Sequence, residues 1–163
     1  AMDAARALLG ERLPEQVGAS IVHGDYRLGN MIVADGKIQG VLDWELCTLG
    51  DPLADVGYLL NAWVQPGEVD TRQGDQVPTA VGGFGDRDAL AARYARETGR
   101  DLSSIAYYRA FSHWRLAAIG EGVYKRYRLG AMGSREDLDL SEFADSVERR
   151  AEAALELLEG GAG

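Results

Sequence analysis

The sequence is poor in several residue types, and each shortage excludes a class of protein. A single cysteine, Cys47, rules out an internal disulfide and a cysteine-based zinc site, and it fits a reducing compartment. No apolar run approaches the length of a membrane-spanning helix. The formal net charge of −9 argues against non-specific binding to nucleic acid, which requires a basic surface. These shortages predict a cytoplasmic protein that binds neither membrane nor nucleic acid.

What the sequence does contain is enough for a folded domain. Its 163 residues can bury one sizeable core, and a hydrophobic content of 46% argues against disorder. Asp35-Gly36 separates two β-rich runs, residues 31–33 and 38–42, and this dipeptide is a strong signal for a hairpin turn. Apolar spacing and capping residues predict helices at residues 3–13, 53–64, 88–98, 103–129 and from about 139 or 141 onward. The predicted order is therefore one hairpin followed by helices.

Polar side chains gather in the stretch HGDYRLGN, residues 23–30, and again at the end of the hairpin. Asp25 and Asn30 belong to the stretch, and Asp43 follows the second strand. Because a hairpin reverses the chain, we expect residues 30 and 43 to lie side by side at its open end. Two carboxylates and an amide oxygen around one pocket are hard ligands of the kind that suit magnesium. Arg27 adds a planar positive group suited to phosphate, although a simple ion pair would explain it equally well.

This pattern resembles a known family. The spacing HxDxxxxN, a hairpin and then the Asp of LDWE are similar to the catalytic and metal-binding segment of aminoglycoside phosphotransferases and choline kinases, a branch of the protein-kinase-like fold. The resemblance continues through GDPLADVGYLL and is closest in look to the branch associated with acyl-CoA dehydrogenases. It implies an α+β, mostly α fold over residues 1–163, a single domain. That domain would be the C-terminal lobe, a small β-hairpin with a helical bundle.

The resemblance also implies a role for each residue of the pattern. Asp25 would orient or deprotonate the acceptor hydroxyl, and Arg27 would contact the transferred phosphate. Asn30 and Asp43 would bind Mg²⁺ together with ATP. Three further residues are expected to support the loop without reacting: His23, Asp51 and Asp55.

The function implied is an ATP- and Mg²⁺-dependent phosphotransferase, a small-molecule kinase that transfers the γ-phosphate to a hydroxyl group. Hydroxyacyl-CoA and aminoglycoside-like compounds are the acceptors suggested. Two alternatives remain open. One is a metal-dependent hydrolase that uses His23, Asp25 and Asp43. The other is a non-catalytic, degenerate kinase lobe that only binds.

The kinase-like fold also needs a β-rich N-terminal lobe, with a phosphate-covering loop and a lysine on a strand. Only 22 residues precede His23, and none of them is lysine. The chain's two lysines, Lys37 and Lys125, lie beside the hairpin turn and in a late helix. We therefore expect the nucleotide-binding lobe to be absent and the isolated chain to be inactive. Self-association through the surface that the lobe would cover is a further expectation.

Overall fold

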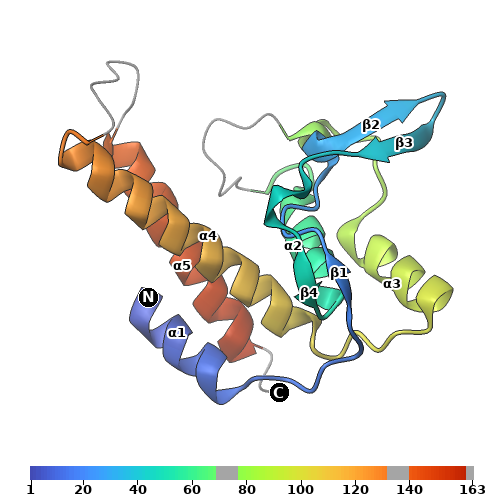
Figure 1. Cartoon of the computed structure of the whole chain (residues 1–163), viewed down its shortest axis with the longest axis horizontal. Helices are drawn as coiled ribbons and strands as arrows, with labels where there is room; N and C mark the ends of the chain where they lie inside the picture. The colour runs from blue at the N-terminus through green and yellow to red at the C-terminus, as the bar shows by residue number, and fades with distance from the viewer. Residues whose placement is uncertain (69–76, 132–139, 161–163) are drawn as a thin grey trace.

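The fold is mostly helical, as the sequence predicted, and it contains two small pairs of strands. The structure is a computed structural model that describes residues 1–68, 77–131 and 140–160 (Figure 1). Within them lie the helices α1 (Met2–Glu11), α2 (Leu53–Ala62), α3 (Arg87–Thr98), α4 (Ile105–Arg128) and α5 (Leu140–Gly160). The strands are β1 (Ser20–Val22), β2 (Met31–Ala34), β3 (Lys37–Val41) and β4 (Thr48–Gly50). Single-turn helices occur at Leu28–Asn30, Trp44–Leu46 and Pro78–Val81.

The predicted hairpin is present and projects from the helical body at the upper right of Figure 1. Strands β2 and β3 are antiparallel, with Met31 opposite Val41 and Ala34 opposite Lys37. The turn residues Asp35 and Gly36 have φ values of 51° and 70°, a region that Asp tolerates and Gly favours. The turn signal in the sequence therefore reflects a backbone requirement.

A second antiparallel pair, β1 with β4, was not predicted. Each strand has three residues, and the pairing places Ser20 opposite Gly50 and Val22 opposite Thr48. The apolar side chains between these ends face outward, and Leu49 is 79% exposed. Neither strand is long enough to show an alternating pattern, so only the fold reveals the pair. Its effect is to hold the start of the polar loop beside the segment that follows the hairpin.

Capping residues delimit α3 as the sequence predicted. The carboxylate of Asp86 accepts a hydrogen bond from the amide of Ala89 at 2.6 Å, and Gly99 ends the helix in the left-handed conformation with φ 67°. Helix α2 ends at Ala62, slightly before the predicted residue 64. Among the described residues, no helix has the length and apolar character needed to cross a bilayer.

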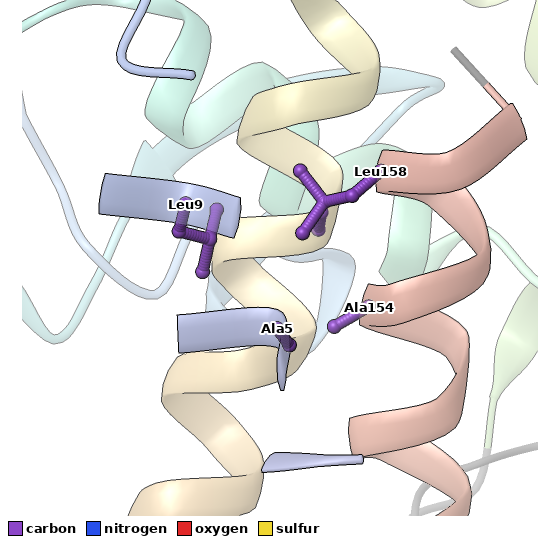
Figure 2. Close-up of a cluster of buried hydrophobic side chains, with 5 residues drawn as sticks. Ala5, Leu9, Ala154 and Leu158 are labelled. Carbon is purple, nitrogen blue, oxygen red and sulfur yellow. The ribbon is translucent and has the colours of Figure 1, made fainter. Parts of the chain in front are cut away.

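The largest interface joins the two long helices, α4 and α5, which run side by side with α1 packed against them (Figure 1). Figure 2 shows Ala5 and Leu9 of α1 facing Ala154 and Leu158 of α5. Ala110 of α4 completes this buried cluster. Small alanine side chains at its centre let three helices approach closely, and the cluster anchors the end of the domain away from the hairpin.

Helix α4 is buried on two sides. Tyr108 packs against α2, while Ala110 and Ala117 belong to clusters shared with α1 and α5. The crossing with α2 is so close that a Cβ on Gly57 would lie 2.8 Å from the Tyr108 carbonyl carbon. Helix α2 is thereby held tightly against α4, and α2 carries two residues that contact the polar loop.

Candidate active site

The polar loop, residues 23–30, connects β1 to β2 and is organised around His23. This side chain is only 1% exposed. Its Nε2–H donates to the carbonyl oxygen of Leu42 at 2.7 Å, and its Nδ1 accepts from the amide of Asp25 at 3.2 Å. Its ring also lies 4.7 Å, centroid to centroid, from that of Trp44. Both ring nitrogens are therefore occupied, and His23 ties the loop to the end of the hairpin.

Asp55 of α2 holds the same loop from beneath. Its two carboxylate oxygens accept hydrogen bonds from the amides of His23, at 2.6 Å, and Gly24, at 2.9 Å. Gly24 has φ 86°, and a Cβ there would lie 2.8 Å from the carbonyl oxygen of Leu46. The loop thus requires glycine at this position, and one carboxylate fixes two consecutive amides.

Asp51 precedes α2 and contacts residues from three segments of the chain. It is 4% exposed, and one carboxylate oxygen accepts from the amide of Leu53 at 2.8 Å. The other oxygen accepts from the amide of Val17 at 2.7 Å. Tyr108 also hydrogen-bonds to this carboxylate, and the pKa of its phenol is raised, chiefly by burial and then by the Asp51 charge. Asp51 therefore joins the segment before β1, α2 and α4.

The carboxylate of Asp25 is oriented by neighbouring donors. The side-chain nitrogen of Asn30 donates at 2.8 Å to both the carboxylate and the backbone carbonyl of Asp25. The phenol of Tyr58, on α2, also hydrogen-bonds to this carboxylate. Burial, and then the bond to Asp25, raises the pKa of Tyr58 to about 12, so the phenol stays protonated as a donor at neutral pH.

The structure brings Asn30 and the end of the hairpin together. The carbonyl of Asn30 accepts from the amide of Leu42 at 2.8 Å, and Asp43 is the next residue. Asp43 adopts the left-handed conformation, with φ 69° and ψ 52°, and its side chain is exposed. A residue other than glycine in this region costs on the order of 1 kcal/mol and is common at functional sites. An exposed carboxylate therefore stands at the open end of the hairpin.

The donor atoms in this region fit a magnesium ion. Both hydrogen bonds of the Asn30 amide use its nitrogen, so its side-chain oxygen remains for a cation. With the carboxylate of Asp43 it offers hard oxygen ligands, and magnesium commonly takes its other ligands from water and phosphate. In the described parts of the chain, no three or more His, Cys, Asp or Glu side chains are grouped to hold a metal ion.

Arg27 lies beside Asp25, and the ion pair between these two side chains is long. Its Nε is 3.5 Å from each carboxylate oxygen of Asp25, and the Arg27 side chain is 29% exposed. This separation is long for a charge-assisted hydrogen bond, which is usually below 3 Å. Contact with phosphate and simple pairing with Asp25 both remain compatible with this position.

A cavity of about 290 Å³ opens beside Asp25, and its walls contain residues that the sequence pattern did not identify. Tyr58 follows Asp55 by one helical turn, a spacing that could have identified it. Arg115 of α4 donates to the carbonyl of Gly24, and its guanidinium carbon lies 5.3 Å from the centre of the Tyr58 ring. Arg150 comes from α5, far along the chain, and no local motif marks it.

Comparisons with known proteins agree with this geometry. The model of the phosphotransferase enzyme family matches residues 1–108. A solved structure from Ralstonia eutropha JMP134, described as a predicted aminoglycoside phosphotransferase, superposes with a TM-score of 0.75 at 30% sequence identity. The match covers 98% of this chain and 49% of that one.

Curated relatives match at similar identity. Acyl-CoA dehydrogenase family member 10 of Mus musculus is 37% identical over 83% of this chain, and family member 11 of Homo sapiens is 34% identical over 85%. Family member 11 of Gallus gallus is 31% identical over 88%. The chain spans 13%, 18% and 19% of these three proteins, respectively.

Proposed function

The chain belongs to the phosphotransferase enzyme family, and on that premise we propose that it acts in an ATP- and magnesium-dependent kinase that phosphorylates a hydroxyl group of a small molecule. One observation carries the proposal. Asp25 and Asn30 are joined by a 2.8 Å hydrogen bond, and Asn30 pairs through its backbone with the residue before Asp43. A candidate base and two candidate metal ligands thus meet at one end of a hairpin.

In this proposal, Asp25 binds the acceptor hydroxyl. Donors from Asn30 and Tyr58 fix the direction of its carboxylate, so the hydroxyl meets a preorganised acceptor. The hydroxyl oxygen bonds to the γ-phosphorus of ATP, the bond from that phosphorus to the ADP oxygen breaks, and Asp25 takes the hydroxyl proton. Phosphoryl transfer demands positioning and charge neutralisation more than covalent help from the protein.

Asn30 and Asp43 would hold magnesium next to this base. Bound magnesium supplies charge neutralisation at the phosphate oxygens. The chain's own contribution is to hold Asn30 and to present Asp43. The amide nitrogen of Asn30 is anchored on Asp25, and Asp43 has an exposed side chain on a left-handed backbone. Arg27 pairs with Asp25 at 3.5 Å, and in this proposal it contacts the transferred phosphate.

The hydrolase alternative is weakened by the state of His23. A metal-binding histidine needs a free ring nitrogen, but Nε2 of His23 donates to Leu42 and Nδ1 accepts from Asp25. The non-catalytic alternative predicts that the site binds nucleotide without turnover, so only assays of binding and transfer separate it from the kinase proposal.

The acceptor is proposed to be a hydroxyacyl-type compound in preference to an aminoglycoside. The curated relatives bear the name of acyl-CoA dehydrogenases, and their similarity extends over most of this chain. We also propose that residues outside this chain cover the nucleotide, so assays of transfer use the full-length protein.

Two variants test the proposal, and each removes one carboxylate from the hairpin. Asp43→Asn removes the candidate metal ligand at the open end, and Asp35→Asn is the matched control at the turn. Asp43 and Asp35 both have left-handed backbone conformations, and asparagine tolerates that region, so Asp43→Asn and Asp35→Asn preserve the backbone equally. Titration calorimetry of Mg²⁺-ATP should show affinity reduced by about tenfold or more for Asp43→Asn, because a charged ligand is lost. Asp35→Asn, at the hairpin tip, should bind like the wild type. Equal affinity of folded Asp43→Asn and wild type would contradict the metal assignment.

A further inference from the structure

Among the described residues, more arginines than acids line the cavity beside Asp25, although the chain as a whole has a formal net charge of −9. We propose that this cavity binds an acceptor that bears an anionic group, a carboxylate or a phosphate, and that Arg115 and Arg150 recognise that group. The inference rests on the proposed function and specifies its substrate class. It makes an anionic hydroxy compound, and not a cationic aminoglycoside, the substrate of this site.

Among the residues that the structure describes, three arginines and one acid line the cavity. Arg27, Arg115 and Arg150 converge from the loop, α4 and α5, and Asp25 is the single carboxylate among these described lining residues. The remaining walls are neutral, and the apolar ones are Leu46, Leu116 and Ile119. Arginine presents a planar fork that matches carboxylate and phosphate geometry, so three of them around one cavity favour an anion and repel a cation.

The donor geometry of Arg115 supports the same conclusion. One terminal nitrogen donates to the carbonyl of Gly24, which positions the guanidinium, while its buried Nε–H has no hydrogen-bond partner among the described residues. A buried donor without an acceptor is costly unless a ligand or water supplies one. Arg115 is therefore both fixed in place and short of an acceptor.

A smaller hollow continues from the cavity and shares Tyr58, Leu116 and Arg150 with it. Its other walls include Ser112 and His113, which are 3% and 7% exposed. The Ser112 hydroxyl and the His113 Nδ1 lack partners in the part of the chain that the structure describes. Burial, followed by the positive charges of Arg150, Arg109 and Arg87, lowers the pKa of His113 to about 4. The charges around this hollow are thus positive as well.

The positions of Asp25 and the two arginines suggest where each end of an acceptor would bind. A hydroxyl at Asp25 and an anionic group at Arg115 and Arg150 fit one cavity of about 290 Å³, the size of a small molecule or of one end of a larger one. Asp25 itself would repel the anionic end. An anionic hydroxy compound is therefore oriented with its hydroxyl toward the base, whereas a cationic acceptor would bring its charge to Asp25.

The test measures binding to the 163-residue chain by titration calorimetry, without ATP. The probes are 3-hydroxybutyrate for the carboxylate, glycerol 3-phosphate for the phosphate, and 3-hydroxybutanamide and choline as neutral and cationic controls. At least one anion should bind about tenfold or more tightly than the amide and choline, and the tighter of the two anions identifies the preferred group. Equal or tighter binding of the amide or choline, or no measurable binding of either anion, would overturn the inference.

Variants then locate the contact. Arg150→Gln should lower the affinity for the preferred anion by about tenfold to a hundredfold and leave the affinity for 3-hydroxybutanamide unchanged. Arg150→Lys should restore part of the lost affinity. Arg96→Gln, an exposed arginine of α3, is the matched control. Unchanged anion affinity in folded Arg150→Gln would also overturn the inference. Transfer to neutral or cationic acceptors alone would refute this inference and leave the kinase proposal standing. Anion binding without any transfer in the full-length protein would refute the kinase proposal and leave this inference standing.

Discussion

Replacing Asp55 should loosen the candidate catalytic loop and destabilise the whole domain. Its carboxylate accepts from two consecutive amides, those of His23 at 2.6 Å and Gly24 at 2.9 Å. Both residues are buried, so water cannot easily replace either bond. A buried donor left without a partner costs about 1–3 kcal/mol. Asp55→Ala should therefore lower the free energy of unfolding by about 2–6 kcal/mol, a large share of the 5–15 kcal/mol typical of a domain.

Because that loss could unfold the chain, Asp55→Asn is the sharper variant. Its side-chain oxygen can still accept one amide, while its NH₂ group faces the other. We expect about half of the alanine effect, roughly 1–3 kcal/mol. Urea unfolding followed by circular dichroism measures the difference through the midpoint, provided that the slope is unchanged.

Asp88→Asn is the matched control for this substitution. Asp88 is an exposed acid in the first turn of α3, so its replacement should change stability by less than about 0.5 kcal/mol. If Asp55→Asn were as stable as Asp88→Asn, the two amides would not depend on the Asp55 carboxylate, and the explanation of how the loop is held would be wrong.

Two further predictions concern the packing around α4. Gly57→Ala should destabilise the domain by about 1–3 kcal/mol, because its Cβ would meet the backbone of α4. Gly10→Ala, whose Cβ would meet nothing within 4 Å, should not destabilise it. The pKa of His113 falls from 6.5 to about 4 on folding, because burial disfavours the charged imidazole. The stability that the neutral imidazole contributes to the folded state is therefore fully present above pH 6.5 and is lost as the pH falls toward 4. Between neutral pH and about pH 5.5, His113→Gln should lose about 1 kcal/mol less stability than the wild type, and equal losses would contradict the burial of a neutral imidazole.

The parts of the fold that the sequence predicted well are those set by local backbone chemistry. Asp35-Gly36 fixes a turn because both residues tolerate positive φ, and Asp86 and Gly99 bound α3 through one capping bond and one left-handed residue. The closeness of Asn30 to the end of β3 also followed from the hairpin alone. These features depend on residues that are near one another along the chain.

What the sequence did not predict depends on contacts between distant segments. The β1–β4 pair joins two strands of only three residues each, and its pairing is visible only when the loop between them is folded. Arg150 reaches the cavity because α5 packs along α4, and no local pattern in α5 distinguishes it from the other charged residues of that helix. The two buried sides of α4 likewise follow from its central place among three helices.

The kinase proposal depends most directly on Asp25. Asparagine has nearly the shape of aspartate but cannot take a proton, so Asp25→Asn in the full-length protein should lower kcat by about a hundredfold or more. The affinity for Mg²⁺-ATP should change little. The measurement is ATP consumption with an acceptor on which the wild type turns over, beside calorimetry of the nucleotide. Loss of turnover with retained nucleotide binding is the predicted result, and a kcat within a few-fold of the wild type would show that Asp25 is not the base.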